Sequence, residues 1–180
     1  NKAMDMDKLI NELTVYSGID NNRIPYNFHR INVGEYFRDC IEEVGLELES
    51  KNIRLNYSNV VDPSTRIIAD PEQLKRVINN IVGNSIKYMD KPLGIIDIRI
   101  LDEIDSIRVE IEDNGKGIAA KDLSNIFERF FRTDASRNSS KGGSGIGLSI
   151  VKAVMDSFQK EYGVQNYENG VAFWFELDMK

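Results

Sequence analysis

The sequence has little of the chemistry that builds cysteine-rich or nucleic-acid-binding proteins. Its 180 residues include one cysteine, Cys40, and one histidine, His29. A single cysteine excludes an internal disulfide and a metal site built from several cysteines, and it indicates a reducing compartment. No apolar run approaches the roughly 18 residues that a membrane span needs, and no signal-peptide pattern opens the chain. The net charge of −6 argues against a nucleic-acid partner, which usually requires a basic face.

The spacing of apolar residues predicts a mixture of helices and strands. Helical spacing predicts helices over 4–16, from Asn32 to about 48, from Pro71 to about 89, and over 147–158, with a helix-like stretch over 121–131. Alternation predicts a hairpin of strands 96–100 and 107–111, a final strand over 171–177, and short strands at 53–57 and 65–69. These elements predict an α+β fold, a two-layer α/β sandwich whose mixed, mostly antiparallel sheet is covered on one face by helices.

A stripe of polar side chains runs along the helix that begins at Pro71. Asn80, Asn84 and Lys87 lie about 100° around the helix from its apolar face. A solvated face explains this stripe as well as a ligand site does. In a ligand site, an asparagine oxygen suits Mg²⁺ and a lysine offers phosphate a point charge. Tyr88 lies between the polar and apolar faces, where its ring could cover a flat base.

A glycine-containing loop follows the predicted strand 107–111. Its sequence is Asp113-Asn114-Gly115-Lys116-Gly117, and a tight turn is the simplest interpretation. No matching partner strand follows, however. An aspartate at a strand end can accept a hydrogen bond from an exocyclic amine, and glycines let the backbone approach a ligand.

A second glycine run, 142–148, opens the predicted helix over 147–158. Backbone N–H groups at a helix start can bind phosphate, where the helix dipole favours negative charge. A Rossmann motif would need a preceding strand, but the preceding stretch 132–141 is polar and rich in serine. A P-loop would need Gly-Lys-Ser/Thr after the glycines, and this is absent.

These segments occur in a specific order along the chain. Asn80-Ile-Val-Gly-Asn84-Ser-Ile-Lys87-Tyr88 comes first, then Asp113-Asn-Gly-Lys-Gly117, then 126–132 (Ile-Phe-Glu-Arg-Phe-Phe-Arg), then 143–148 (Gly-Ser-Gly-Ile-Gly-Leu). The order resembles the N box, first glycine box, F box and second glycine box of histidine-kinase catalytic domains. This superfamily is shared with DNA gyrase and the MutL repair ATPase. The similarity spans about residues 32–178.

The resemblance implies a site for ATP and Mg²⁺. Asn84 corresponds to the magnesium ligand, and Asn80 to its helper one helical turn earlier. Lys87 and Arg132 correspond to phosphate contacts, and Tyr88 to the residue that stacks on adenine.

The glycine boxes and the F box complete the implied site. Asp113 corresponds to the acceptor for the adenine amine, with Gly115 and Gly117 beside it. Phe127 and Phe130 are expected to anchor an ATP lid over roughly 119–144 by packing. The phosphate-facing hinge of this lid corresponds to Gly143, Gly145 and Gly147, followed by Leu148.

Two departures from related patterns refine the expected function. Gyrase-type ATPases place a glutamate where Asn80 stands, and an asparagine cannot act as a general base. The acceptor histidine of the family precedes an acidic residue on a dimerisation helix, whereas His29 precedes Arg30. We therefore interpret His29 as a structural or surface residue.

We therefore expect a protein histidine kinase that transfers the γ-phosphate of ATP to a histidine absent from this chain. Residues 1–20 are expected to end a dimerisation helix and its linker, and 21–180 to form the ATP-binding domain. Expected partners are that dimerisation domain and a response regulator. The full-length protein is expected to be a homodimer, and this fragment a monomeric cytoplasmic part of a membrane-bound sensor. The alternatives are a gyrase-type hydrolase, a nucleotide sensor without phosphotransfer, and an anti-sigma serine kinase.

Overall fold

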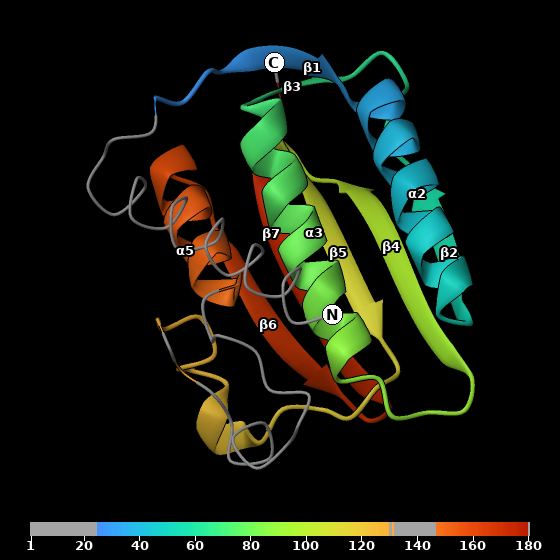
Figure 1. Cartoon of the computed structure of the whole chain (residues 1–180). Coiled ribbons are helices and arrows are strands. Elements are labelled where there is room, and N and C mark those ends of the chain that lie inside the picture. Colours follow the sequence, from blue (N-terminus) through green and yellow to red (C-terminus); the bar gives the residue numbers. More distant parts are fainter. Residues whose placement is uncertain (1–24, 130, 132–146, 180) are drawn as a thin grey trace, which may run out of the picture.

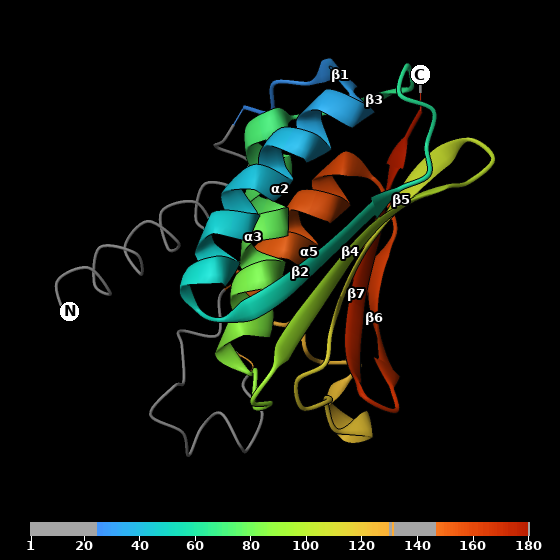
Figure 2. The ribbon, with the colours of Figure 1, turned by 90° about the vertical axis from the view of Figure 1, so that its right-hand side faces the viewer.

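The strands and helices form two layers, a sheet and a row of helices packed on one of its faces (Figures 1 and 2). The computed structural model describes residues 25–129, 131 and 147–179. In chain order the elements are β1 (His29–Asn32), α2 (Val33–Ser50), β2 (Ile53–Asn59), β3 (Arg66–Ala69), α3 (Pro71–Lys87), β4 (Gly94–Asp102), β5 (Ser106–Asp113), η1 (Ala120–Asp122), α5 (Gly147–Phe158), β6 (Tyr162–Tyr167) and β7 (Gly170–Asp178).

The main sheet has the strand order β2-β4-β5-β7-β6. Strands β2 and β4 pair in parallel, whereas β4–β5, β5–β7 and β6–β7 are antiparallel. Helix α3 lies between α2 and α5 over one face of the sheet (Figure 1). The predicted two-layer sandwich with a mixed, mostly antiparallel sheet is confirmed. None of the helices that the structure describes is long and apolar enough to cross a membrane.

Side-chain caps fix where α2 and α3 begin, as the sequence predicts. Asn32 Oδ1 accepts a hydrogen bond from the backbone N–H of Glu35 at 2.9 Å. Asp70 Oδ1 accepts from the N–H groups of Glu72 at 3.1 Å and Gln73 at 3.3 Å. These bonds satisfy helix N–H groups that have no partner within the helix.

The hydrophobic core lies between the helices and the inner face of the sheet. The alternating residues of β4, β5 and β7 point into it, and all of them are buried: Ile96, Ile98, Ile100, Ile107, Val109, Ile111, Phe173, Phe175 and Leu177. Cys40 of α2 is 8% exposed, and its burial raises the pKa of its thiol. Cys40 is therefore part of the hydrophobic core.

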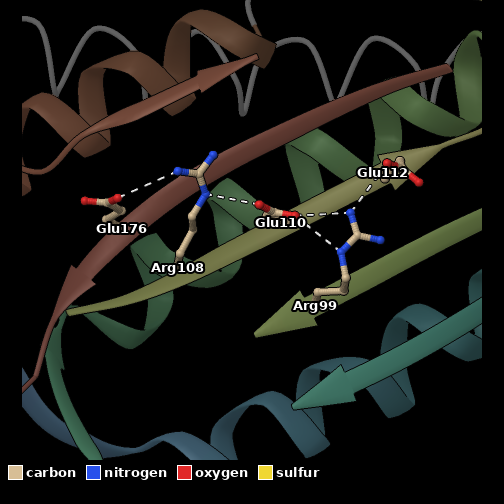
Figure 3. A network of polar contacts seen from close by, with 5 residues as sticks. All are labelled: Arg99, Arg108, Glu110, Glu112 and Glu176. Carbon is tan, nitrogen blue, oxygen red and sulfur yellow. Dashed lines mark hydrogen bonds and ion pairs between the residues drawn. The ribbon is translucent and has the colours of Figure 1, made fainter. Parts of the chain in front are cut away.

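The outer face of the sheet carries a ladder of ion pairs (Figure 3). Glu110 lies at its centre, with its oxygens 3.1 Å from Arg99 Nη2 and 3.2 Å from Arg108 Nε. Glu112 also pairs with Arg99, at 3.5 Å. Glu176 lies 3.9 Å from Arg108, so the ladder joins β4, β5 and β7. Opposite charges across neighbouring strands stabilise the sheet on the face opposite the helices that the structure describes.

Two details differ from the sequence-based expectations. The helix-like stretch expected over 121–131 does not form an α-helix. After η1, each backbone N–H donates to the carbonyl oxygen three residues earlier: Asn125 to Asp122, Glu128 to Asn125 and Phe131 to Glu128. The backbone therefore forms successive turns. Strands β1 and β6 were not predicted. His29 lies exposed on β1, directly before α2, and its interpretation as a structural or surface residue is confirmed.

Candidate functional site

The polar stripe lies on the side of α3 that is turned toward α5. On the opposite flank, Lys75 forms an ion pair of 2.6 Å with Glu43 of α2. Asn80 follows Lys75 by five residues and therefore lies about 140° further around the helix. Asn80, Asn84 and Lys87 are each only partly exposed. The Nδ2 atom of Asn80 is buried and has no hydrogen-bond partner in the described part of the chain. A stripe that buries an unpaired amide is typical of a ligand site rather than of a solvated face.

Asp113 ends β5 as a buried carboxylate, with 4% of the residue exposed. Burial raises the pKa of its carboxyl group, and the nearby charges of Glu112 and Asp90 raise it further. The Ser85 hydroxyl and the Gly115 N–H favour the charged form, but burial dominates. The Gly115 N–H donates to Asp113 Oδ1 at 2.9 Å. The site therefore holds a hydrogen-bond acceptor whose charge is incompletely compensated by the protein itself.

Gly115 allows the end of β5 to touch the end of α3. A Cβ atom at this position would lie 2.9 Å from the backbone oxygen of Tyr88 and 3.0 Å from Asp113 Oδ1. Both distances are too short for a side chain, and the closer atom belongs to the rigid backbone. Only glycine fits here, and the first glycine box therefore packs directly against the C-terminal end of the polar stripe.

Two lysine side chains approach the ring of Tyr88. Lys87 Nζ is 5.1 Å from the ring centre, and Lys116 Nζ is 5.7 Å from it. Both lie within the range of cation–π attraction. The ring is partly exposed, so it can present a flat surface beside two positive charges. The sequence analysis assigned no role to Lys116.

Asn114 holds the loop against the start of β4. Its Oδ1 atom accepts from the Ile95 N–H at 2.7 Å, and its Nδ2 atom donates to the Leu93 oxygen at 3.0 Å. The sequence analysis missed this role. The preference of asparagine for bonding nearby backbone in turns was the available signal, but it does not identify a partner about twenty residues away.

Helix α5 begins at Gly147, as predicted, so its N-terminal dipole lies next to the second glycine box. Leu148 is partly buried and packs against the hydrophobic core, so its side chain supports the helix start. Phe127 makes edge contacts with Tyr162 and Phe173, at centroid distances of 5.1 and 6.0 Å. The expected packing of Phe127 is confirmed, and its role as an anchor of the lid stays a prediction. The predicted residues Phe130, Arg132, Gly143 and Gly145, and the segments 1–24 and 132–146, lie outside the described residues.

The arrangement fits a cation that arrives with its ligand. Within 25–129, 131 and 147–179, no group of three or more histidine, cysteine, aspartate or glutamate residues is placed to hold a metal ion. Mg²⁺ commonly keeps water ligands and binds through few protein oxygens together with substrate phosphates. The neutral oxygen of Asn84, on the stripe beside Lys87, suits such a shared cation.

Comparisons with known proteins identify relatives of this chain. The family model described as "Histidine kinase-, DNA gyrase B-, and HSP90-like ATPase" matches residues 69–180. The peroxide stress-activated histidine kinase mak2 of Schizosaccharomyces pombe is 30% identical over 96% of this chain. The chain spans 8% of that relative's length.

Solved structures show the same fold. The catalytic domain of histidine kinase ThkA superposes with a TM-score of 0.72 and 28% identity, covering 84% of this chain and 97% of that domain. ThkA in complex with the response regulator TrrA superposes with a TM-score of 0.74 and 26% identity, over 96% of this chain and 48% of that one. The chain thus belongs to the histidine kinase-, DNA gyrase B-, and HSP90-like ATPase family, and it corresponds to the ATP-binding catalytic domain of a histidine kinase.

Proposed function

We propose that this chain binds ATP with Mg²⁺ and transfers the γ-phosphate to a histidine on a separate dimerisation domain. The observation that carries this proposal is the contact between the buried Asp113 and the C-terminal end of the polar stripe on α3, made through Gly115. It supports the proposal because a buried hydrogen-bond acceptor lies next to side chains whose chemistry suits phosphate and metal.

Asp113 and Tyr88 are the proposed adenine contacts. The carboxylate accepts the exocyclic amine of adenine, and a guanine carbonyl at the same place would be repelled. The Gly115 N–H already bonds one carboxylate oxygen and so fixes the orientation of the group. The ring of Tyr88 covers the base, while Gly115 and Gly117 let the loop backbone approach it.

The stripe and the glycine hinge are the proposed groups for the triphosphate. Asn84 supplies an oxygen to Mg²⁺, and Asn80 assists from one helical turn earlier. Lys87 and Arg132 supply positive charge to the phosphates. The backbone at Gly143, Gly145 and Gly147, at the N-terminus of α5, offers N–H groups and a favourable dipole.

Phosphotransfer is favoured over hydrolysis because the site has no general base at the decisive position. Asn80 occupies the place of the water-activating glutamate of gyrase-type ATPases, and its amide cannot take a proton. When bound, Mg²⁺ neutralises the charge that develops on the phosphate oxygens. The protein's own contribution is to orient the nucleotide and hold it for an external acceptor.

The proposed partners follow from the missing acceptor and from the relatives. A histidine-bearing dimerisation domain of the same kinase supplies the acceptor, and the full-length protein forms a homodimer through it. A response regulator acts downstream, since the similar kinase ThkA forms a complex with one. We place the chain in the cytoplasmic part of a membrane-bound sensor.

Radiolabelled ATP distinguishes this proposal from its alternatives. The chain is mixed with a separately prepared histidine-bearing helix hairpin, and acid-labile label is measured on each protein. We expect label on the hairpin and none on His29, which lies exposed on β1. Binding of ATP without any transfer would favour a nucleotide sensor. Release of inorganic phosphate in the absence of the hairpin would favour a hydrolase.

A further inference from the structure

Asn166 of β6 holds both backbone groups of Ile118 with a single side chain. Its Oδ1 atom accepts a hydrogen bond from the Ile118 N–H at 3.0 Å. Its Nδ2 atom donates to the carbonyl oxygen of the same residue. The side-chain amide thus bonds Ile118 as a neighbouring strand would, although 48 residues separate the two positions.

The hairpin of β6 and β7 also contacts the other end of the loop. Gly170 has a φ of +156°, and a Cβ atom there would lie 1.8 Å from the backbone oxygen of Asp113. At the C-terminal end of the loop, a Cβ atom on Gly117 would lie 3.1 Å from Asn166 Oδ1. The hairpin therefore packs against the start of the loop at Asp113 and against its end at Gly117 and Ile118.

The loop 113–118 is consequently held from two sides. Asn114 ties it to the start of β4, through Ile95 and Leu93. Asn166 ties its last residues to β6, at the far edge of the sheet. Between these two ties lie Gly115, which touches the Tyr88 backbone, and Lys116, which approaches the Tyr88 ring.

We propose that Asn166 is a positioning residue for the purine side of the nucleotide site. It fixes Gly117 and Ile118, so that Asp113, Gly115 and Tyr88 keep the spacing that a purine requires. The inference rests on the proposed function, since it names a further residue of the same ATP site. Asn166 touches no ligand itself, and it acts through the backbone of the loop.

The expected phenotype is a loss of affinity that is separable from a loss of fold. Asn166 and Ile118 are only partly buried, so water can replace the lost hydrogen bonds when the side chain is removed. The edge strand itself stays paired through its backbone register with β7. The loop, however, gains freedom that nucleotide binding has to remove again.

The test compares Asn166→Ala and Asn166→Asp with Gln165→Ala. Asn166→Asp keeps an acceptor for the Ile118 N–H but turns a second acceptor toward the Ile118 carbonyl. Gln165 is the exposed neighbour on the same strand and has no role in the loop. Affinities for ATP, ADP and adenosine are measured by titration calorimetry, alongside the thermal unfolding midpoint and amide exchange at Gly117 and Ile118.

We expect Asn166→Ala to weaken ATP, ADP and adenosine by the same factor, about three- to tenfold. Amide exchange should accelerate at Ile118, and the unfolding midpoint should stay close to that of Gln165→Ala. Asn166→Asp should bind ATP, ADP and adenosine as weakly as Asn166→Ala does. With the acceptor hairpin present, the KM for ATP should rise while kcat is retained.

Unchanged affinity for all three ligands in Asn166→Ala would overturn the inference. A loss confined to ATP would also overturn it, because the effect would then arise on the phosphate side. So would a fall in affinity that only tracks a large fall in the unfolding midpoint. Failure of the unmodified chain to bind ATP would instead reject the proposed function, and the two failures are therefore distinguishable.

Discussion

Asp70 Oδ2 accepts a hydrogen bond from the backbone N–H of Asn27 at 2.8 Å, while its other oxygen caps α3. One buried carboxylate thus joins the segment before β1 to the helix that carries the polar stripe. Next to it, Tyr26 and Phe28 pack on Phe158 of α5, with ring centroids 5.9 and 5.4 Å away. Residues 26–28, before β1, therefore contact both α3 and α5, the helices that flank the candidate site.

We predict that Asp70→Ala lowers the free energy of unfolding by about 1–2 kcal/mol, because two helix N–H groups and the Asn27 N–H lose their acceptor. Urea denaturation monitored by circular dichroism measures the effect. Asp62→Ala is the matched control: Asp62 bonds Ser64 in an exposed turn, and its loss should cost about 0.5 kcal/mol or less. Equal effects of the two substitutions would refute the double role of Asp70.

We predict that Asp113→Asn stabilises the nucleotide-free protein at neutral pH. Burial raises the pKa of this carboxyl in the folded state, so its contribution to stability is fully present below the unfolded pKa of about 4 and is lost as the pH rises through the folded pKa. The amide carries no charge, and its oxygen can still accept from Gly115. The thermal unfolding midpoint of the variant should be higher than that of the unmodified protein at about pH 7, and the difference should shrink toward about pH 3.5. A gain that did not depend on pH would contradict this explanation.

We predict that Asp113→Ala weakens ATP binding about tenfold to a hundredfold, the value of a charged hydrogen-bond acceptor, or roughly 1.5–3 kcal/mol. The unmodified protein should bind GTP poorly. Calorimetric titration with both nucleotides checks the assignment. Similar affinities for ATP and GTP in the unmodified chain would remove adenine recognition from Asp113.

We predict that Asn84→Ala loses the magnesium-dependent part of ATP affinity while the fold survives. Asn84 lies on the polar stripe, outside the buried face of α3. Asn79→Ala is a close control, because Asn79 is the same residue type on the same helix and is exposed. Calorimetric titrations with ATP, with and without Mg²⁺, distinguish the two variants. If magnesium enhanced ATP affinity equally in both variants, the metal role of Asn84 would be wrong.

We predict that Glu110→Gln destabilises the fold by about 1 kcal/mol, because Glu110 pairs with both Arg99 and Arg108 and its side chain is 17% exposed. Salt screens partly buried ion pairs less than exposed ones, so the loss should shrink only modestly at high ionic strength. Glu168→Gln, at the exposed turn between β6 and β7, should have no measurable effect. Equal denaturation midpoints for both variants would show that the ladder contributes nothing.

The elements that could be predicted from the sequence are those whose burial repeats with a clear period. Strands β4 and β5 alternate between buried and partly exposed residues, as does β7 from Phe173 onward, because one face is buried and the other carries the ion-pair ladder. Strand β6 lies at the sheet edge, and none of its residues is fully buried, so it lacks the buried apolar alternation that marks the inner strands. Residues 121–131 have apolar side chains at helical spacing, but Phe127 uses its ring to pack on Tyr162 and Phe173 while the backbone forms turns.

The candidate site likewise has a part that the sequence predicts and a part that it does not. The stripe on α3 and the glycine loop follow local rules of spacing and turn chemistry, so their positions were predictable. Asn166 and Gly170 were not, because each matters through a loop about fifty residues earlier in the chain. Local patterns carry no signal for a side chain that bonds the backbone of a distant residue.

The packing of Trp174 has an optical consequence. It is the only tryptophan of the chain, and its ring lies 4.0 Å from the guanidinium carbon of Arg108, on the face of the sheet away from the helices. Gly163 of β6 lies so close that a Cβ atom would approach the indole to 2.7 Å. Intrinsic fluorescence therefore reports on the junction of β6 and β7, on the face of the sheet opposite the helices. A change in emission on adding ATP would reveal that the hairpin carrying Asn166 moves when the site fills.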